Sequence, residues 1–187
     1  MSKIALLMIG FIGFVSTAYC QEEKGQVDAY TFLAISTGGP SGGRTASFDF
    51  RITRYTTDQE VEELANILKT QGQDGLRRAM EELDVGRINL VGKTGTQISV
   101  ARKRQTPDGT ILTIVTPRNM SFVELYNSGR SVDYPFGYVR FTLNEKGEGT
   151  GQIMAATKIT FNKKKDIIEM ESFGNQYLKA TNVRPNK

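Results

Sequence analysis

Histidine is absent from this chain of 187 residues, and its absence narrows the chemistry that the protein can perform. Without histidine there is no Ser-His-Asp or Cys-His nucleophile system, no ordinary zinc or non-haem iron site, and no histidine general base. Catalysis is not excluded, because carboxylate pairs, lysine or tyrosine can still transfer protons. No stretch carries a specific catalytic signature, and we expect neither a metal nor a cofactor.

The sequence also lacks a hydrophobic run long enough to cross a bilayer, since residues 4–15 supply only 12 residues. A basic start precedes this run and small residues follow it, as is typical of an export signal. We therefore expect residues 1–20 to be a signal peptide and the mature protein to be periplasmic or secreted. The alternative is an N-terminal anchor helix that the mature protein keeps.

Cysteine occurs once, as Cys20, so the chain forms no internal disulfide. Stability must therefore come from packing rather than from cross-links. Cys20 lies at the end of the expected signal peptide and is a candidate lipidation site, although the large Tyr19 before it is unusual there. A membrane is an expected partner only if Cys20 is lipidated.

Neither sign of charge dominates, because the chain has 24 Lys and Arg residues and 20 Asp and Glu residues, which gives a formal net charge of +4. This net charge is only mildly basic, and it is lower than the positive charge typical of nucleic-acid-binding domains, so we expect no nucleic-acid partner. Two basic clusters, residues 102–104 and 163–165, lie at predicted strand ends or turns. A solvated surface is the default interpretation of both clusters, and binding of an anionic partner is the alternative.

Alternation of apolar and polar residues predicts strands along most of the chain after a polar, disordered lead-in at residues 21–26. The clearest are residues 138–143, 152–161 and 167–173, which glycine-rich and lysine-rich turns join into an antiparallel meander. The other predicted strands are residues 27–36, 45–55, 87–91, 96–104 and 110–116. Residues 121–126 fit either a short strand or a helical turn.

Two helices are predicted between the second and third strands. Thr57 and Glu60 have the spacing of a capping box, and the apolar residues that follow recur at helical spacing to about Gln71. Gly72 is expected to end this helix, and Asp74 to begin a second, short helix. Such a two-helix hairpin needs a sheet face to lie against.

These elements predict a single α+β domain over residues 27–187. Its centre is a strongly curved antiparallel sheet or incomplete β-barrel of about seven to nine strands, with the two-helix hairpin inserted between strands 2 and 3.

Three features of the mature region occur together: a strand followed by the helix hairpin at residues 61–83, the Tyr134-Pro135-Phe136 step, and the glycine turn at residues 147–151 that leads to residues 156–159. Through these features, which cover most of the mature region, the chain resembles a family of small exported bacterial proteins with no known activity. The resemblance implies export and a single α+β domain, and it transfers no catalytic residue.

Aromatic residues occur on nearly every predicted strand, so at least one sheet face must carry large apolar side chains. An ordinary core is one interpretation, and a partly open cavity for an apolar ligand is the other. The candidate ligand-binding residues are Phe32, Phe48, Phe50, Phe141 and Phe161. The loop that contains Gly38, Gly39, Gly42 and Gly43 is expected to be flexible and could close over a pocket.

The leading hypothesis is an exported, non-enzymatic binding protein for a small apolar or amphipathic ligand. The first alternative is an envelope structural or protein-interaction module with an envelope protein as partner. The second alternative is a histidine-free hydrolase or isomerase that uses carboxylates.

Overall fold

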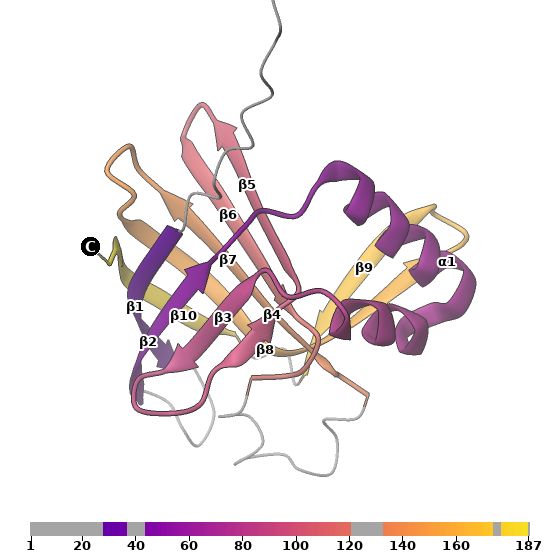
Figure 1. Cartoon of the computed structure of the whole chain (residues 1–187), viewed down its shortest axis with the longest axis horizontal. Helices are drawn as coiled ribbons and strands as arrows, with labels where there is room; N and C mark the ends of the chain where they lie inside the picture. Colours follow the sequence, from indigo (N-terminus) through magenta and orange to yellow (C-terminus); the bar gives the residue numbers. More distant parts are fainter. Residues whose placement is uncertain (1–27, 37–43, 121–132, 174–176, 187) are drawn as a thin grey trace, which may run out of the picture.

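The computed structural model describes residues 28–36, 44–120, 133–173 and 177–186, and within these it contains one helix and ten strands (Figure 1). In chain order they are β1 (Asp28–Ser36), β2 (Thr45–Ile52), α1 (Asp58–Glu81), β3 (Gly86–Leu90), β4 (Thr96–Ile98), β5 (Val100–Thr106), β6 (Gly109–Thr116), β7 (Phe136–Leu143), β8 (Gly149–Asn162), β9 (Ile167–Ser172) and β10 (Leu178–Pro185).

All the strand pairings are antiparallel, and the strands form one curved sheet in the order β4-β3-β2-β1-β10-β8-β7-β6-β5. Strand β9 lies off this path and pairs with β8, whose far half projects away from the barrel towards the helix (Figure 1). The predicted α+β class and incomplete antiparallel barrel are therefore confirmed.

The two ends of the sheet path approach each other because β4 and β5 are consecutive pieces of one bent segment. Only Ser99 separates them, and its backbone N–H donates to the carbonyl of Val115 on β6 at 3.0 Å. Beyond β2, the N–H of Thr56 donates to the carbonyl of Ala101, whose own N–H donates to the Thr56 hydroxyl, both at 2.9 Å. These bonds nearly close the barrel.

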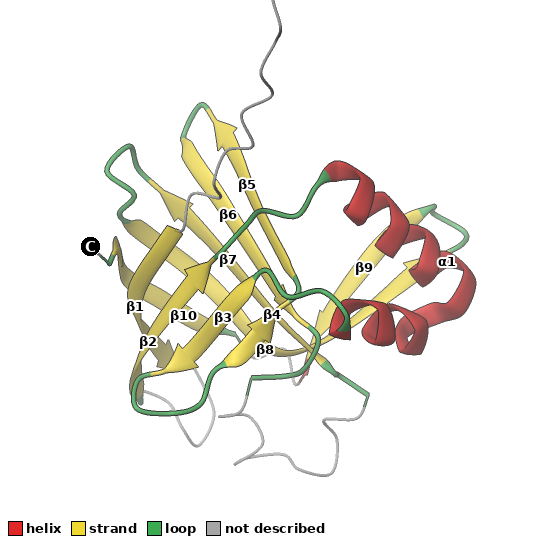
Figure 2. Ribbon diagram, viewed as in Figure 1, coloured by secondary structure: helices red, strands yellow, loops and turns green. Residues whose placement is uncertain are grey.

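The helix differs from the prediction. The capping box is present, since Thr57 N–H donates to Glu60 Oε2 at 2.8 Å and Glu60 N–H donates to the Thr57 hydroxyl at 3.2 Å. The two-helix hairpin, however, is wrong, because α1 is one helix with a kink at Gly72 (φ 70°, ψ −164°) (Figure 2). Glycine adopts this positive φ without a Cβ clash, so the chain changes direction at one residue and needs no loop.

Strand β10 was not predicted, although it lies between β1 and β8 in the barrel. Its pairing with both neighbours shifts register, and Asn182 within it has a φ of 56°. This irregularity breaks the alternation that reveals a strand in a sequence.

The buried residues form two clusters. The barrel interior holds the larger cluster, to which every strand of the path contributes. The smaller one lies outside the barrel, where Leu64, Leu68, Leu76 and Met80 of α1 pack with Phe136 and Ile159. The helix thus lies against the outer side of β7 and β8 (Figure 2).

Candidate functional site

Four of the five predicted ligand-binding phenylalanines meet in the barrel interior. The ring centroids of Phe32 and Phe48 are 5.2 Å apart and those of Phe50 and Phe141 are 5.3 Å apart, and both pairs are stacked. Phe32 also meets Phe141 edge to face at 5.2 Å. Phe161 is not part of this group, because it packs beside α1 with Lys69 Nζ 4.9 Å from its ring centroid.

These interior rings pack against one another and leave little surface exposed: Phe50 is 2% exposed and Phe141 is fully buried. None of the five phenylalanines lines either of the two surface hollows described below. The sequence therefore located the aromatic interior correctly, but the open space lies elsewhere.

Several expected features lie outside the described residues. They are the signal peptide and lead-in, the candidate lipidation site Cys20, and the glycine loop of Gly38, Gly39, Gly42 and Gly43. The segment at residues 121–126, with its open choice between strand and helix, lies outside them as well.

The larger hollow, of about 370 Å³, lies at one end of the barrel. The start of β1, the β5–β6 hairpin, the turn between β7 and β8, and the end of β10 surround it. Its lining is Asp28, Ala29, Tyr30, Lys103, Gln105, Thr110, Leu143, Asn144, Glu145, Lys146, Gly147, Pro185 and Asn186. Charged and polar side chains thus share this space with an aromatic ring and with aliphatic surface.

The turn between β7 and β8 is held in shape by Asn144. Its side-chain Oδ1 accepts hydrogen bonds from the backbone N–H groups of Lys146 at 2.9 Å and Glu148 at 3.0 Å. Gly147 has a φ of 76°, and a Cβ there would lie 2.9 Å from Pro185. A larger residue would strain the turn and push it away from β10 at the rim of the hollow.

Strand alternation brings an acidic and a basic side chain to the inside of the barrel end. Asp28 shares a strand face with the buried Tyr30 and Phe32 of β1, and Lys103 shares one with the buried Ala101 of β5. Lys103 Nζ lies 3.0 Å from Asp28 Oδ2, and the Asp28 side chain is only 16% exposed. The ion pair is therefore partly shielded from water.

Tyr55, in the segment after β2, completes this cluster. Its hydroxyl donates to the same Oδ2 of Asp28, and Lys103 Nζ lies 5.7 Å from its ring centroid. Burial first, and then the hydrogen bond to Asp28, raise the pKa of Tyr55 above its ordinary value. Burial and the Asp28 charge also raise the pKa of Tyr30. Both phenols therefore stay protonated at neutral pH and act as hydrogen-bond donors.

The cluster is better suited to recognition than to proton abstraction. Asp28 Oδ2 already accepts from two donors, and neither tyrosine is a ready base. Among the residues that the structure describes, no group of three or more Cys, Asp or Glu side chains could hold a metal ion. Below the cluster, Tyr30 stacks on Phe50 with ring centroids 5.1 Å apart, so the hollow has an aromatic floor.

Sequence reasoning did not identify Asp28, Tyr55 and Lys103 as a group, because 75 residues separate the first from the last. A signal was available in the alternation of β5. It places Lys103 on the opposite strand face from Arg102 and Arg104, and therefore on the inner side.

Comparisons with models of protein families, with curated proteins and with solved structures found no match to this chain. Within the described residues, no helix is both long enough and apolar enough to cross a membrane.

Proposed function

We propose that this protein is an exported, non-enzymatic binding protein that holds a small amphipathic molecule at the open end of its barrel. The observation that carries this proposal is the hollow of about 370 Å³, whose rim is charged and whose floor is aromatic. Its volume falls in the lower part of the range of small-molecule sites, roughly 300–1,000 Å³.

The lining separates into two parts that match the two ends of an amphipathic molecule. Asp28, Lys103 and Gln105 offer charges and an amide to a polar group. Tyr30 and Leu143, which are 6% and 2% exposed, lie at the apolar base of the hollow, where a ring or a short chain would rest on their outer edges. The packed phenylalanines beneath make a shallow site at the barrel end more favourable than a deep one in the interior, since a deep site would require several stacked rings to move.

Export rests on the character of residues 1–20, and the periplasm or the exterior of the cell is the proposed location. A lipid on Cys20 would attach the same binding domain to a membrane.

Native mass spectrometry tests this proposal on the mature protein purified from its own cell envelope. We expect a small molecule that stays bound in the native spectrum and is lost on unfolding. Thr110→Trp should empty the site because Thr110 lines the hollow, whereas Thr150→Trp, on an exposed position of β8, should keep the bound molecule. A bare wild-type protein would contradict the proposal, and denaturing analysis would also reveal a lipid on Cys20.

An envelope protein-interaction module is the second candidate, and strand β9 favours it. β9 pairs with β8 along one edge, and no other described strand pairs with it. Ile167, Ile168 and Met170 on this strand are 45–48% exposed. An edge strand with exposed apolar residues is a ready site for an added strand from a partner. Cross-linking in the envelope should capture a partner that Ile168→Asp abolishes and Thr150→Asp does not.

The carboxylate-based hydrolase or isomerase is the remaining alternative, and Asp28 with Lys103 would have to carry it. Turnover of a substrate that Asp28→Asn abolishes, without loss of binding, would favour this alternative.

A further inference from the structure

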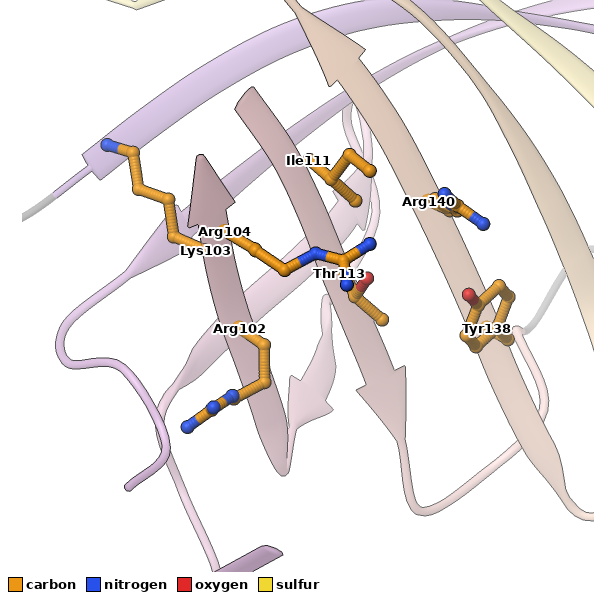
Figure 3. Close-up of a pocket in the computed structure, with 7 residues that line it drawn as sticks. All are labelled: Arg102, Lys103, Arg104, Ile111, Thr113, Tyr138 and Arg140. Carbon is orange, nitrogen blue, oxygen red and sulfur yellow. The ribbon is translucent and has the colours of Figure 1, made fainter. Parts of the chain in front are cut away.

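A second hollow, of about 290 Å³, lies on the outer surface of β5, β6 and β7, away from the barrel interior (Figure 3). The strand register builds it, since Thr113 on β6 is opposite both Arg102 on β5 and Arg140 on β7. Arg104 lies two residues beyond Arg102 on the same strand face, and Tyr138 lies two residues before Arg140. Four of the lining residues are cationic and none is acidic.

Two of these cations already have partners. Arg102 donates through Nη1 to the carbonyl of Thr56 at 2.8 Å, and its Nη2 pairs with Asp58 at the start of α1. Lys103 turns to the other side of β5 and pairs with Asp28. These interactions fix the strand and take both charges out of the hollow.

Arg104 and Arg140 are different, because no ion pair within the described part of the chain includes either of them. Both residues are exposed, and the Arg104 side chain extends across β6 beside Thr113 (Figure 3). Two guanidinium groups beside one hollow repel each other in the absence of an anion. Their planar forks match the oxygens of phosphate and sulfate groups.

The spacing allows both arginines to contact one ligand. Strands β5 and β7 flank β6, so their backbones are about 10 Å apart, which is twice the usual interstrand distance. Each arginine can lean towards the middle, where the Thr113 hydroxyl, and that of Tyr138 beside it, can add donors to an oxyanion.

We propose that this outer hollow is an anion-binding site that takes a phosphate or sulfate group between Arg104 and Arg140. The site faces the opposite side of the sheet from the barrel-end hollow, and it does not depend on the function proposed above. The group could come from a free ion or from a phospholipid headgroup, because both present the same tetrahedral oxyanion.

Lys179 provides a matched control for the charge effect. It is exposed and lies in the same cross-strand row as Arg140, since Gln152 is opposite both residues, but it does not line the hollow. Arg140→Gln and Lys179→Gln therefore remove the same charge from the same face of the barrel. Their effects on anion binding will differ only if the anion binds at a specific site that includes Arg140.

The test is a titration of the full chain and its variants with inorganic phosphate and with inorganic sulfate. Isothermal titration calorimetry measures the affinity, and backbone amide chemical shifts locate the bound ion. We expect Arg140→Gln and Arg104→Gln each to weaken binding about tenfold, and Lys179→Gln to weaken it less than twofold. Arg104→Lys should retain only part of the affinity, since lysine keeps the charge but loses the fork.

Equal weakening of anion binding by Arg140→Gln and Lys179→Gln would overturn the proposal, because it would show that the anion responds only to the overall positive charge of the surface. Absence of binding to wild-type protein would overturn it as well. Vesicles of phosphatidylglycerol, compared with vesicles of phosphatidylcholine, separate the two sources. Tighter binding to the former that Arg140→Gln removes would assign a lipid headgroup, and phosphate binding alone would assign the free ion.

Discussion

Lys103 and Asp28 are 75 residues apart in the chain, and their Nζ and Oδ2 atoms lie 3.0 Å apart inside one end of the barrel. The pair links the start of β1 to β5, the last strand of the sheet path. Directly beneath it begins the aromatic interior, where Tyr30 stacks on Phe50. The ion pair therefore lies above the apolar interior and forms one wall of the proposed ligand site.

Asp28→Asn should lower the free energy of unfolding by about 1–2 kcal/mol, between the values for exposed and for buried ion pairs. The reason is that Lys103 and the Tyr55 hydroxyl both lose their charged acceptor. Denaturant unfolding measures the effect. Asp166→Asn is the control, since its pair with Lys69 is 3.7 Å long and the Asp166 side chain is 82% exposed, and it should change stability by less than about 0.5 kcal/mol.

Stability should fall at alkaline pH because of Tyr55. Its pKa is raised in the folded state, so the folded protein keeps a proton that the unfolded chain releases above about pH 10. The Tyr55 contribution is therefore fully present below pH 10 and declines as the pH rises further. Tyr55→Phe should flatten this decline in a series of unfolding curves between pH 8 and 11. A decline equally steep in the variant would exclude Tyr55 as its cause.

Phe50→Ala should cost about 3–5 kcal/mol, because it removes a ring that packs against three other aromatic rings in a fully enclosed interior. Phe161→Ala should cost clearly less, since Phe161 is only partly buried beside α1. Thermal unfolding of the two variants side by side makes the comparison. Equal losses would contradict the separation between a packed interior and a peripheral cluster.

Gly72→Ala should destabilise α1 by about 1–3 kcal/mol through backbone strain alone, because its φ and ψ lie in a region that is almost exclusive to glycine. Its φ is 70°, and an added Cβ would meet no atom within 4 Å, so a steric clash with neighbours plays no part. Gly72→Asn should cost about as much, because at a ψ of −164° the residue lies outside the left-handed helical region that asparagine tolerates. Circular dichroism during thermal unfolding measures both variants, and an Ala variant as stable as the wild type would contradict the kink.

The sequence predicted the curved antiparallel sheet well because alternation is a local signal that each strand carries by itself. The prediction from sequence failed where the backbone departs from regular strand or helix geometry. β10 contains a register shift and the positive φ of Asn182, and Gly72 bends a helix instead of ending it. Both are single-residue conformations that composition does not reveal.

The candidate site was harder to predict than the fold. Alternation placed Phe32, Phe48, Phe50 and Phe141 on inward faces, and these residues do meet. Phe161 also alternates, but it belongs to the part of β8 that projects beyond the barrel and lies against α1. Strand pairing decides whether the apolar face of a strand points into the barrel or packs against the helix. The sequence of one strand does not reveal its pairing with distant segments.

The most direct measurement is a titration of the mature protein with an uncharged amphipathic fluorophore, N-phenyl-1-naphthylamine, in wild type, Thr110→Trp and Thr150→Trp. A ligand site at the barrel end predicts saturable binding to the wild type, about tenfold weaker binding when tryptophan fills the hollow at position 110, and unchanged binding when it is added at position 150. Circular dichroism confirms that each variant is folded. Equal affinity in all three proteins, or no saturable binding to the wild type, would contradict the proposed site.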